Sequence, residues 1–292
     1  DVNPPVHAWA AMFLYNSEKA LSGESDIAFL KRVFRKLMSN FNWWINQKDR
    51  FGKNVFEGGF LGLDNISLFD RKEPLPTGGY IEVADGTAWM ALSCQGMLEM
   101  AVELAAKDPS YQEAALKVVD HMMQIASVVN RIGDDGLWDE VDGFYYDLLR
   151  FPDGTSMRLK VRSIIGLLPL CATTVIEKYQ REQSPLLVNR CFEGLRQFPS
   201  LRETMHPTGP EHLGVADRGI LAIVNPTRLK GILAKLFDED EFLSAYGIRS
   251  VSRYHAANPY VFKVHGDEYG VRYVPGQSDN GMFGGNTNWR GP

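Results

Sequence analysis

The sequence predicts an all-α protein whose helices are arranged in antiparallel pairs as a toroid. Two observations predict this fold class: apolar residues recur at helical spacing in segments joined by short turns, and long loops rich in glycine and carboxylates separate the pairs. Loops of this length in a compact protein are usually functional. We therefore expect the short turns on one face and the long loops together on the other. The chain shows no repeat of fixed period, so a regular solenoid is disfavoured.

The first predicted helical pair opens the chain. Apolar residues repeat at helical spacing from Val6 to Leu14, directly after two prolines, and a longer apolar stripe runs from Ile27 to Ile45. Ser25-Asp26 precedes the second stripe and is a typical N-cap signal.

The second predicted pair covers residues 87–106 and 111–129, joined tightly at Asp108-Pro109. Further helices are expected over residues 164–179, 185–196 and 227–237. β-Hairpins are expected over residues 144–161, around Pro152-Asp153-Gly154, and over residues 260–274, across Gly266-Asp267-Glu268.

Composition narrows the class of protein. With 45% hydrophobic and 23% charged residues, the 292-residue chain is an ordinary globular protein, and its net charge of −5 carries no basic stripe for nucleic acid. The apolar run of residues 164–176 is too short to cross a bilayer and contains Pro169. The cysteines Cys94, Cys171 and Cys191 lie in apolar helical patterns as small buried hydrophobes, which favours a reducing, cytoplasmic location.

A glycine-rich loop, residues 57–71, holds the best catalytic candidate. Glycine lets the backbone approach a ligand closely, so a carboxylate on such a loop can face a substrate. The loop carries Glu57, Asp64 and Asp70, and Asn65 follows the central aspartate. The position of Asp64 between glycines and Asn65 makes it the foremost functional candidate.

Carboxylates paired with tryptophans favour chemistry on a sugar. Glycoside hydrolysis needs one protonated and one ionised carboxyl group across the scissile bond. A second acidic cluster occupies the long loop at residues 134–147. Flat aromatic faces near the loop ends suit the apolar face of a sugar ring. The aromatic candidates are Trp43, Trp44, Trp89, Trp138 and Trp289.

Structural roles compete with these assignments. Acidic loop residues are mostly solvated or cap helices, and Asp85 is equally well explained as the N-cap of the helix through Trp89. Trp43 and Trp44 lie on a strong helical stripe, so at least one of them is expected in the core.

Cofactor chemistry finds no support in the motifs. The acidic run at residues 134–143 fails the register of a calcium loop, and the histidines form no zinc motif. The chain has no phosphate-binding loop, dinucleotide fingerprint or Gly-x-Ser-x-Gly elbow. We therefore expect neither a metal nor a cofactor.

Four segments together resemble the microbial glucosidase-like members of glycoside hydrolase family 63, relatives of the mannosyl-oligosaccharide glucosidase that trims N-glycans. The resemblance runs through nearly the whole chain. It is carried by residues 57–71, 84–90, 242–250 and 284–292, the last reading Gly-Gly-Asn-Thr-Asn-Trp-Arg-Gly-Pro.

This resemblance implies an (α/α)6 barrel and hydrolysis of a terminal α-glucosidic bond with inversion. The segment Gly62-Leu63-Asp64-Asn65-x-Ser67 is similar to a family signature whose aspartate is the general acid, so Asp64 inherits that role. Other residues match positions that line the sugar pocket in such barrels. The expected substrate-binding set is Trp44, Phe60, Asn65, Asp85, Trp89, Trp138, Asn288, Trp289 and Arg290.

The resemblance also implies that the general base is a glutamate beyond Pro292. Because about seven expected helices fall short of the twelve in such a barrel, residues 1–292 are expected to be one partial catalytic domain, cut from a longer protein at both ends and inactive alone. The expected partner is a small carbohydrate. A trehalase-like or glycogen-debranching glucosidase, and a non-catalytic carbohydrate-binding or assembly component, remain as alternatives.

Overall fold

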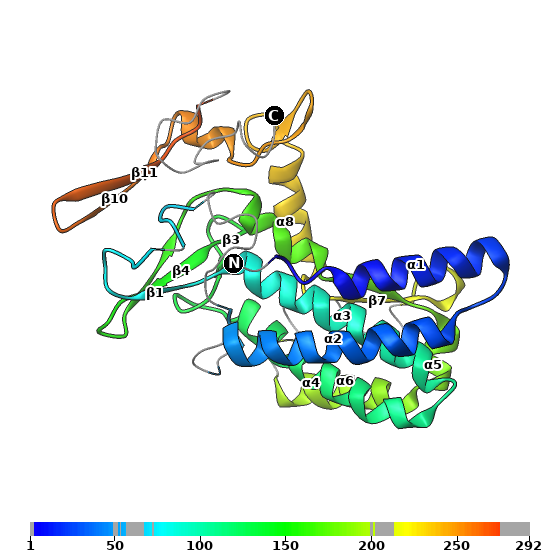
Figure 1. Ribbon diagram of the computed structural model, residues 1–292. Helices are drawn as coiled ribbons and strands as arrows, with labels where there is room; N and C mark the ends of the chain where they lie inside the picture. Colours follow the sequence, from blue (N-terminus) through cyan, green and yellow to red (C-terminus); the bar gives the residue numbers. More distant parts are fainter. Residues whose placement is uncertain are drawn as a thin grey trace.

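The computed structural model of the chain describes residues 3–48, 52, 54–56, 67–71, 73–198, 201 and 213–274. This part is mostly helical and carries small antiparallel sheets (Figure 1). The expected helical class is confirmed, while closure into an (α/α)6 barrel stays a prediction. The helices are α1 (His7–Ser22), α2 (Ile27–Lys48), α3 (Ala84–Ala105), α4 (Gln112–Val129), α5 (Lys178–Gln183), α6 (Pro185–Gln197) and α8 (Pro226–Leu236).

Both predicted helical pairs form. Asp26 begins α2 as expected, because its Oδ1 accepts a hydrogen bond from the Phe29 amide at 2.7 Å. Helix α3 is buried almost all round and contacts α1, α2 and α4, so it is the centre of the core. Gly96 permits the close approach of α1, since a Cβ there would lie 2.9 Å from the Cβ of Ala8.

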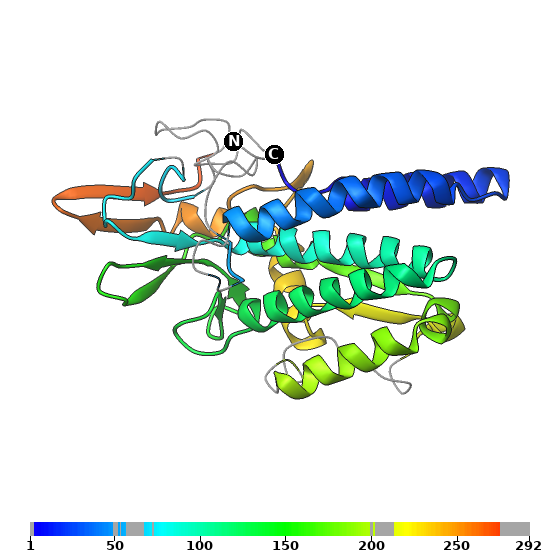
Figure 2. The same cartoon turned by 60° about the horizontal axis from the view of Figure 1, so that its bottom comes forward.

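The two ends of the helical layer differ, as the pattern of turns predicts. The α1–α2 and α3–α4 connections are short and lie at one end of the helices, at the right in Figures 1 and 2. Two hairpins lie beyond the opposite end, at the left: β4 (Asp147–Arg150) with β5 (Ser156–Leu159), and β10 (Tyr260–Val264) with β11 (Asp267–Val271). We call this second end the loop end.

A three-stranded antiparallel sheet at the loop end joins two of the long segments. Its order is β1–β4–β5, with Tyr80 opposite Arg150 and Arg150 opposite Ser156. The expected hairpin turn at residues 152–154 connects β4 to β5. The strands of this sheet and of the neighbouring ribbon are β1 (Tyr80–Glu82), β4 (Asp147–Arg150), β5 (Ser156–Leu159), β2 (Trp138–Asp139) and β3 (Phe144–Tyr145).

The hairpin expected within residues 260–274 is present as β10 (Tyr260–Val264) and β11 (Asp267–Val271). Its turn lies one residue earlier than expected, at His265 and Gly266, which both have positive φ as a tight two-residue turn requires. A further two-stranded ribbon pairs β8 (Leu243–Ser244) with β9 (Gly247–Ile248).

The helix expected over residues 164–179 is wrong. This stretch forms the 3-10 helix η2 (Ile164–Cys171), the strand β6 (Thr173–Ile176) and the start of α5. Pro169 and the run of β-branched residues in β6 disfavour a continuous helix. Strand β6 pairs with β7 (Gly219–Ala222), which comes from much later in the chain. The remaining 3-10 turns are η1 (Pro109–Tyr111), η4 (Val215–Asp217) and η5 (Arg253–Ala256).

The three cysteines are free thiols, buried or half-buried, as the apolar pattern predicts. Burial raises the pKa of Cys191 to about 11 and that of Cys171 to about 12. Within the described ranges, no helix combines the length and apolar character that a membrane span requires.

Candidate functional site

A buried ion cluster at the loop end joins three segments of the chain. Arg71 ends the glycine-rich loop segment, Asp85 lies in the first turn of α3, and Asp147 begins β4. Nη1 of Arg71 donates to both carboxylate oxygens of Asp85, at 2.9 and 2.8 Å, and Nη2 donates to Oδ2 of Asp147 at 2.7 Å. We call these three residues the Arg71 cluster.

Asp147 also caps α3. Its second oxygen accepts a hydrogen bond from the Ala84 amide at 2.9 Å, which satisfies one of the unpaired donors at the start of the helix. Asp85 is therefore inside the helix rather than its N-cap, since Val83 occupies the cap position. The cluster fixes the start of α3, the start of β4 and the end of the loop segment to one another.

The electrostatics of the Arg71 cluster follow from its burial. The side chains of Arg71 and Asp85 are fully buried and that of Asp147 is 6% exposed. Burial opposes the charged guanidinium, but Asp85 and Asp147 outweigh it and raise the pKa of Arg71. Burial raises the pKa of Asp147; Arg71 opposes this rise and Asp85 adds to it. Two carboxylates thus share one cation.

The last residue of the Asp64 signature and the two residues after it are part of the core. Ser67, Leu68 and Phe69 are buried, and Phe69 makes edge-on contacts with Phe262 and Tyr269 of the β10–β11 hairpin, with ring centroids 5.6 and 5.0 Å apart. Ser67 and Asp147 also line a cavity of about 10 Å³, close to the smallest volume that holds one water. The chain is therefore anchored in the core at residues 67–69.

A second ion network ties the sheet together beside the cluster. Nη2 of Arg150 donates to Oε2 of Glu82 at 2.9 Å, and Nη1 of Arg150 pairs with Asp135. Because Glu82 lies in β1 and Arg150 in β4, this network reinforces the same strand pairing that the Arg71 cluster adjoins.

A third network covers Trp138. The guanidinium of Arg228 lies 4.6 Å from the centroid of the Trp138 ring, and Tyr145 packs edge-on against that ring with centroids 4.8 Å apart. Nη1 of Arg228 donates to Oδ1 of Asn130 at 2.7 Å. Trp138 is thus 4% exposed, with one face occupied by a cation.

The structure places four of the predicted site residues. Asp85 and Trp138 are buried in the contacts described above. Trp44 is 3% exposed, whereas its neighbour Trp43 is 42% exposed, so Trp44 is the member of the pair that lies in the core. Trp89 is half-buried on α3, and its Nε1 is shielded from solvent with no acceptor in the described part of the chain. Phe60, Asp64, Asn65, Asn288, Trp289 and Arg290 lie outside the described residues.

Two residues that carry the geometry had no individual prediction. The sequence predicts no role for Arg71 beyond its place at the end of the glycine-rich loop, and none for Arg228 beyond its place in an expected helix. Arg71 stands between Asp70 and Glu73 in the sequence, so its neighbours give no sign that its partners are Asp85 and Asp147, and no acidic residue stands near Arg228. Asp147 belonged to the acidic cluster, but its partner was not predictable.

The Arg71 cluster is suited to holding the loop end in place and not to proton transfer to a ligand. Both oxygens of Asp85 are occupied by Arg71, and Asp147 is divided between Arg71 and the start of α3. In the described stretches, no group of three or more His, Cys, Asp or Glu side chains is arranged to hold a metal ion.

Comparison with known proteins gives a long relative without an established function. The chain is 45% identical over 305 residues to the uncharacterized protein YMR196W of Saccharomyces cerevisiae; the match covers all of this chain and 28% of that protein. No family model matches.

Solved structures give weaker likenesses. An uncharacterized conserved protein from Thermus thermophilus aligns with a TM-score of 0.45 and 17% identity, over 64% of this chain and 52% of that one. The GH63 mannosylglycerate hydrolase of the same organism, in complex with glucose, aligns with a TM-score of 0.45 and 16% identity, over 74% of this chain and 58% of that one. Scores below 0.5 do not establish a shared fold.

Proposed function

We propose that the chain is the acid-bearing part of an inverting α-glucosidase, with Asp64 as the general acid. The sequence signature Gly62-Leu63-Asp64-Asn65-x-Ser67 suggests the role. The observation that carries the proposal is the anchoring at the end of this loop: Ser67, Leu68 and Phe69 are buried, and Arg71 is hydrogen-bonded to two carboxylates at the start of α3 and β4. A general acid needs such a rigid support.

In the proposed reaction, Asp64 protonates the leaving glycosidic oxygen while a second carboxylate activates a water on the opposite face of the sugar. Inverting enzymes place these carboxyl groups about 6.5–9.5 Å apart, which leaves room for the water. We propose that the base lies beyond residue 292. We propose that the sugar is bound by Asn65, Phe60, Trp89, Asn288, Trp289 and Arg290. Asp85 is proposed to act indirectly, by holding Arg71 in place.

Activity of the Asp64→Asn variant tests the proposal. The natural full-length protein is assayed on a panel of α-glucosides, including trehalose and a malto-oligosaccharide, and the anomer first released is identified by NMR. A carboxamide cannot deliver the proton, so kcat is expected to fall by roughly 10²–10⁴-fold. Asp70→Asn, which changes an exposed carboxylate in the same loop, is the matched control and keeps its activity.

Near-normal turnover by Asp64→Asn would remove Asp64 from the mechanism. Release of the retained anomer would contradict inversion and require a nucleophile. If the wild-type protein binds sugars and hydrolyses none of the panel, the alternative of a carbohydrate-binding component is favoured instead.

A further inference from the structure

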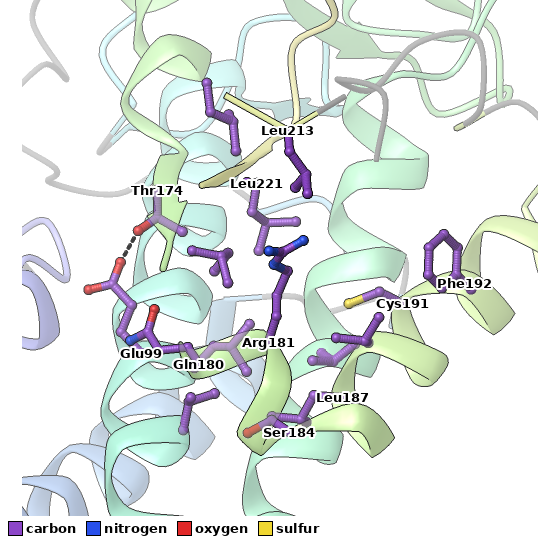
Figure 3. Close-up of a pocket in the computed structure, with 17 residues that line it drawn as sticks. Glu99, Thr174, Gln180, Arg181, Ser184, Leu187, Cys191, Phe192, Leu213 and Leu221 are labelled. Carbon is purple, nitrogen blue, oxygen red and sulfur yellow. Dashed lines mark hydrogen bonds between the residues drawn. The ribbon is translucent and has the colours of Figure 1, made fainter. Parts of the chain in front are cut away.

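A cavity of about 220 Å³ lies between α3, α6 and the β6–β7 sheet, away from the loop end (Figure 3). At a rise of about 1.5 Å per residue, Leu98 in its wall is about 20 Å along α3 from Asp85. The walls are mostly apolar, with Leu98, Val102, Leu187 and Leu221 among them. The cavity is thus separate from the proposed active site.

Most polar groups that line this cavity are already paired. Glu99 accepts a hydrogen bond from the hydroxyl of Thr174, and the side-chain oxygen of Gln180 accepts one from the Glu177 amide at 2.9 Å. Burial raises the pKa of Glu99, although the Thr174 bond opposes that rise, so this carboxyl keeps its proton to a higher pH than an exposed glutamate.

Arg181 is the exception. Figure 3 shows its side chain reaching into the middle of the cavity, among the apolar residues. One terminal nitrogen, Nη2, donates to the carbonyl oxygen of Asp217 at 2.7 Å. Its Nε is shielded from solvent and has no acceptor in the described residues. A buried donor of a charged group without an acceptor is unfavourable, so this nitrogen favours a ligand that brings one.

We propose that this cavity binds a small amphipathic carboxylate, with its carboxylate at Arg181 and its hydrocarbon chain against the walls formed by α3, α6 and β7. The charge of Arg181 and the apolar walls are complementary to those two parts. An apolar cavity of about 150 Å³ accepts a benzene-sized molecule, so about 220 Å³ suits a chain of roughly eight carbon atoms.

Calorimetric titration of the natural full-length protein with sodium octanoate and with 1-octanol tests the proposal. Octanoate is expected to bind at least about tenfold more tightly than 1-octanol, because only the carboxylate pairs with the guanidinium. Arg181→Gln is expected to remove this preference. Val188 is a half-buried residue of the cavity wall on α6, and Val188→Trp is expected to fill the cavity and abolish binding of both compounds. Arg190→Gln is the matched control: it lies on α6, pairs with Asp120 outside the cavity and leaves binding unchanged.

A second measurement does not depend on the variants. An octanoate analogue with a diazirine on its alkyl chain, photoactivated on the wild-type protein, is expected to label peptides from α6 and β7. Labelling confined to other peptides, equal affinity for octanoate and 1-octanol, no binding at millimolar concentration, or an Arg181→Gln variant that binds like Arg190→Gln would each overturn the proposal. Because no turnover is measured, these results are independent of the role of Asp64.

Discussion

Replacing Arg71 by methionine removes the only cation of the Arg71 cluster. Methionine keeps much of the length and apolar bulk of the side chain, but Asp85 and Asp147 are left buried without a cationic partner among the described residues. Breaking a buried ion pair by removing one partner costs about 3–5 kcal/mol, because an uncompensated charge remains away from water. We expect a local loss of stability of that size in Arg71→Met.

The loss is expected to depend on pH. Burial raises the pKa of Asp147, and Arg71 is the group that opposes this rise. An aspartate whose folded pKa lies above its unfolded value contributes stability below about pH 3.9, and this contribution is lost as pH rises through the folded pKa. Without Arg71 the folded pKa rises further, so protonation relieves the variant over a wider range. The deficit of Arg71→Met is therefore smaller at pH 5 than at pH 8.

Hydrogen exchange measured by mass spectrometry checks both statements. Protection factors of peptides from β1, β4 and the start of α3 are compared between Arg71→Met and wild type at pH 5 and pH 8. Since about 1.4 kcal/mol corresponds to a tenfold change, protection is expected to fall by roughly two to four orders of magnitude at pH 8. Arg190→Met, which breaks the exposed pair with Asp120, is the control and is expected to change these peptides far less. An equal or larger deficit at pH 5 would refute the electrostatic reasoning.

Two further predictions concern the support of the loop end. The first concerns buried His255, whose Nε2 accepts a hydrogen bond from the Arg162 amide and whose pKa is lowered by burial. The stability that neutral His255 contributes is therefore full above about pH 6.5 and falls as pH drops through its folded pKa. Hydrogen-exchange protection around η5 is expected to fall over the same pH range, and His255→Gln is expected to flatten this dependence. The second compares two glycines: Gly166→Ala would place a Cβ 2.3 Å from a ring carbon of Phe144 and is expected to cost about 1–3 kcal/mol of stability. Gly231→Ala, in α8, would make only ordinary contacts and is expected to stabilise the protein by about 0.5–1 kcal/mol. Unfolding midpoints that rank the two variants in the opposite order would contradict the packing argument.

Helices were the predictable part of the fold because their signals are local. The apolar stripe of α2 and the Ser25-Asp26 cap lie within one segment, so periodicity located the helix within a few residues. Strand β6 was not predictable in this way, because a short apolar run is compatible with either a helix or a strand. Its partner β7 is more than 40 residues away, so no local signal indicates the pairing.

For the candidate site, the sequence indicated some of the residues but not which residues pair with one another. The loop signature predicts Asp64 as the general acid, and this stays a prediction because Asp64 lies outside the described residues. Asp85 pairs with Arg71, which precedes α3 in the chain. Arg71 also pairs with Asp147, more than 70 residues later, and no local sequence pattern indicates that pairing. Trp138 is covered by Arg228, from much later in the chain, so its aromatic face looked available in the sequence and is occupied in the fold.

The pairing of β1 with β4 has a consequence for the order of folding. Tyr80 lies opposite Arg150, about 70 residues away, whereas the β4–β5 hairpin and the α3–α4 pair close over short turns. Pairings between distant segments form slowly, because the chain between them must first be brought together. We expect β1 to join the sheet after the hairpin and the helical pair have formed. The buried contacts of Ser67, Leu68 and Phe69 with the core, and the pairing of Arg71, would then form late in folding.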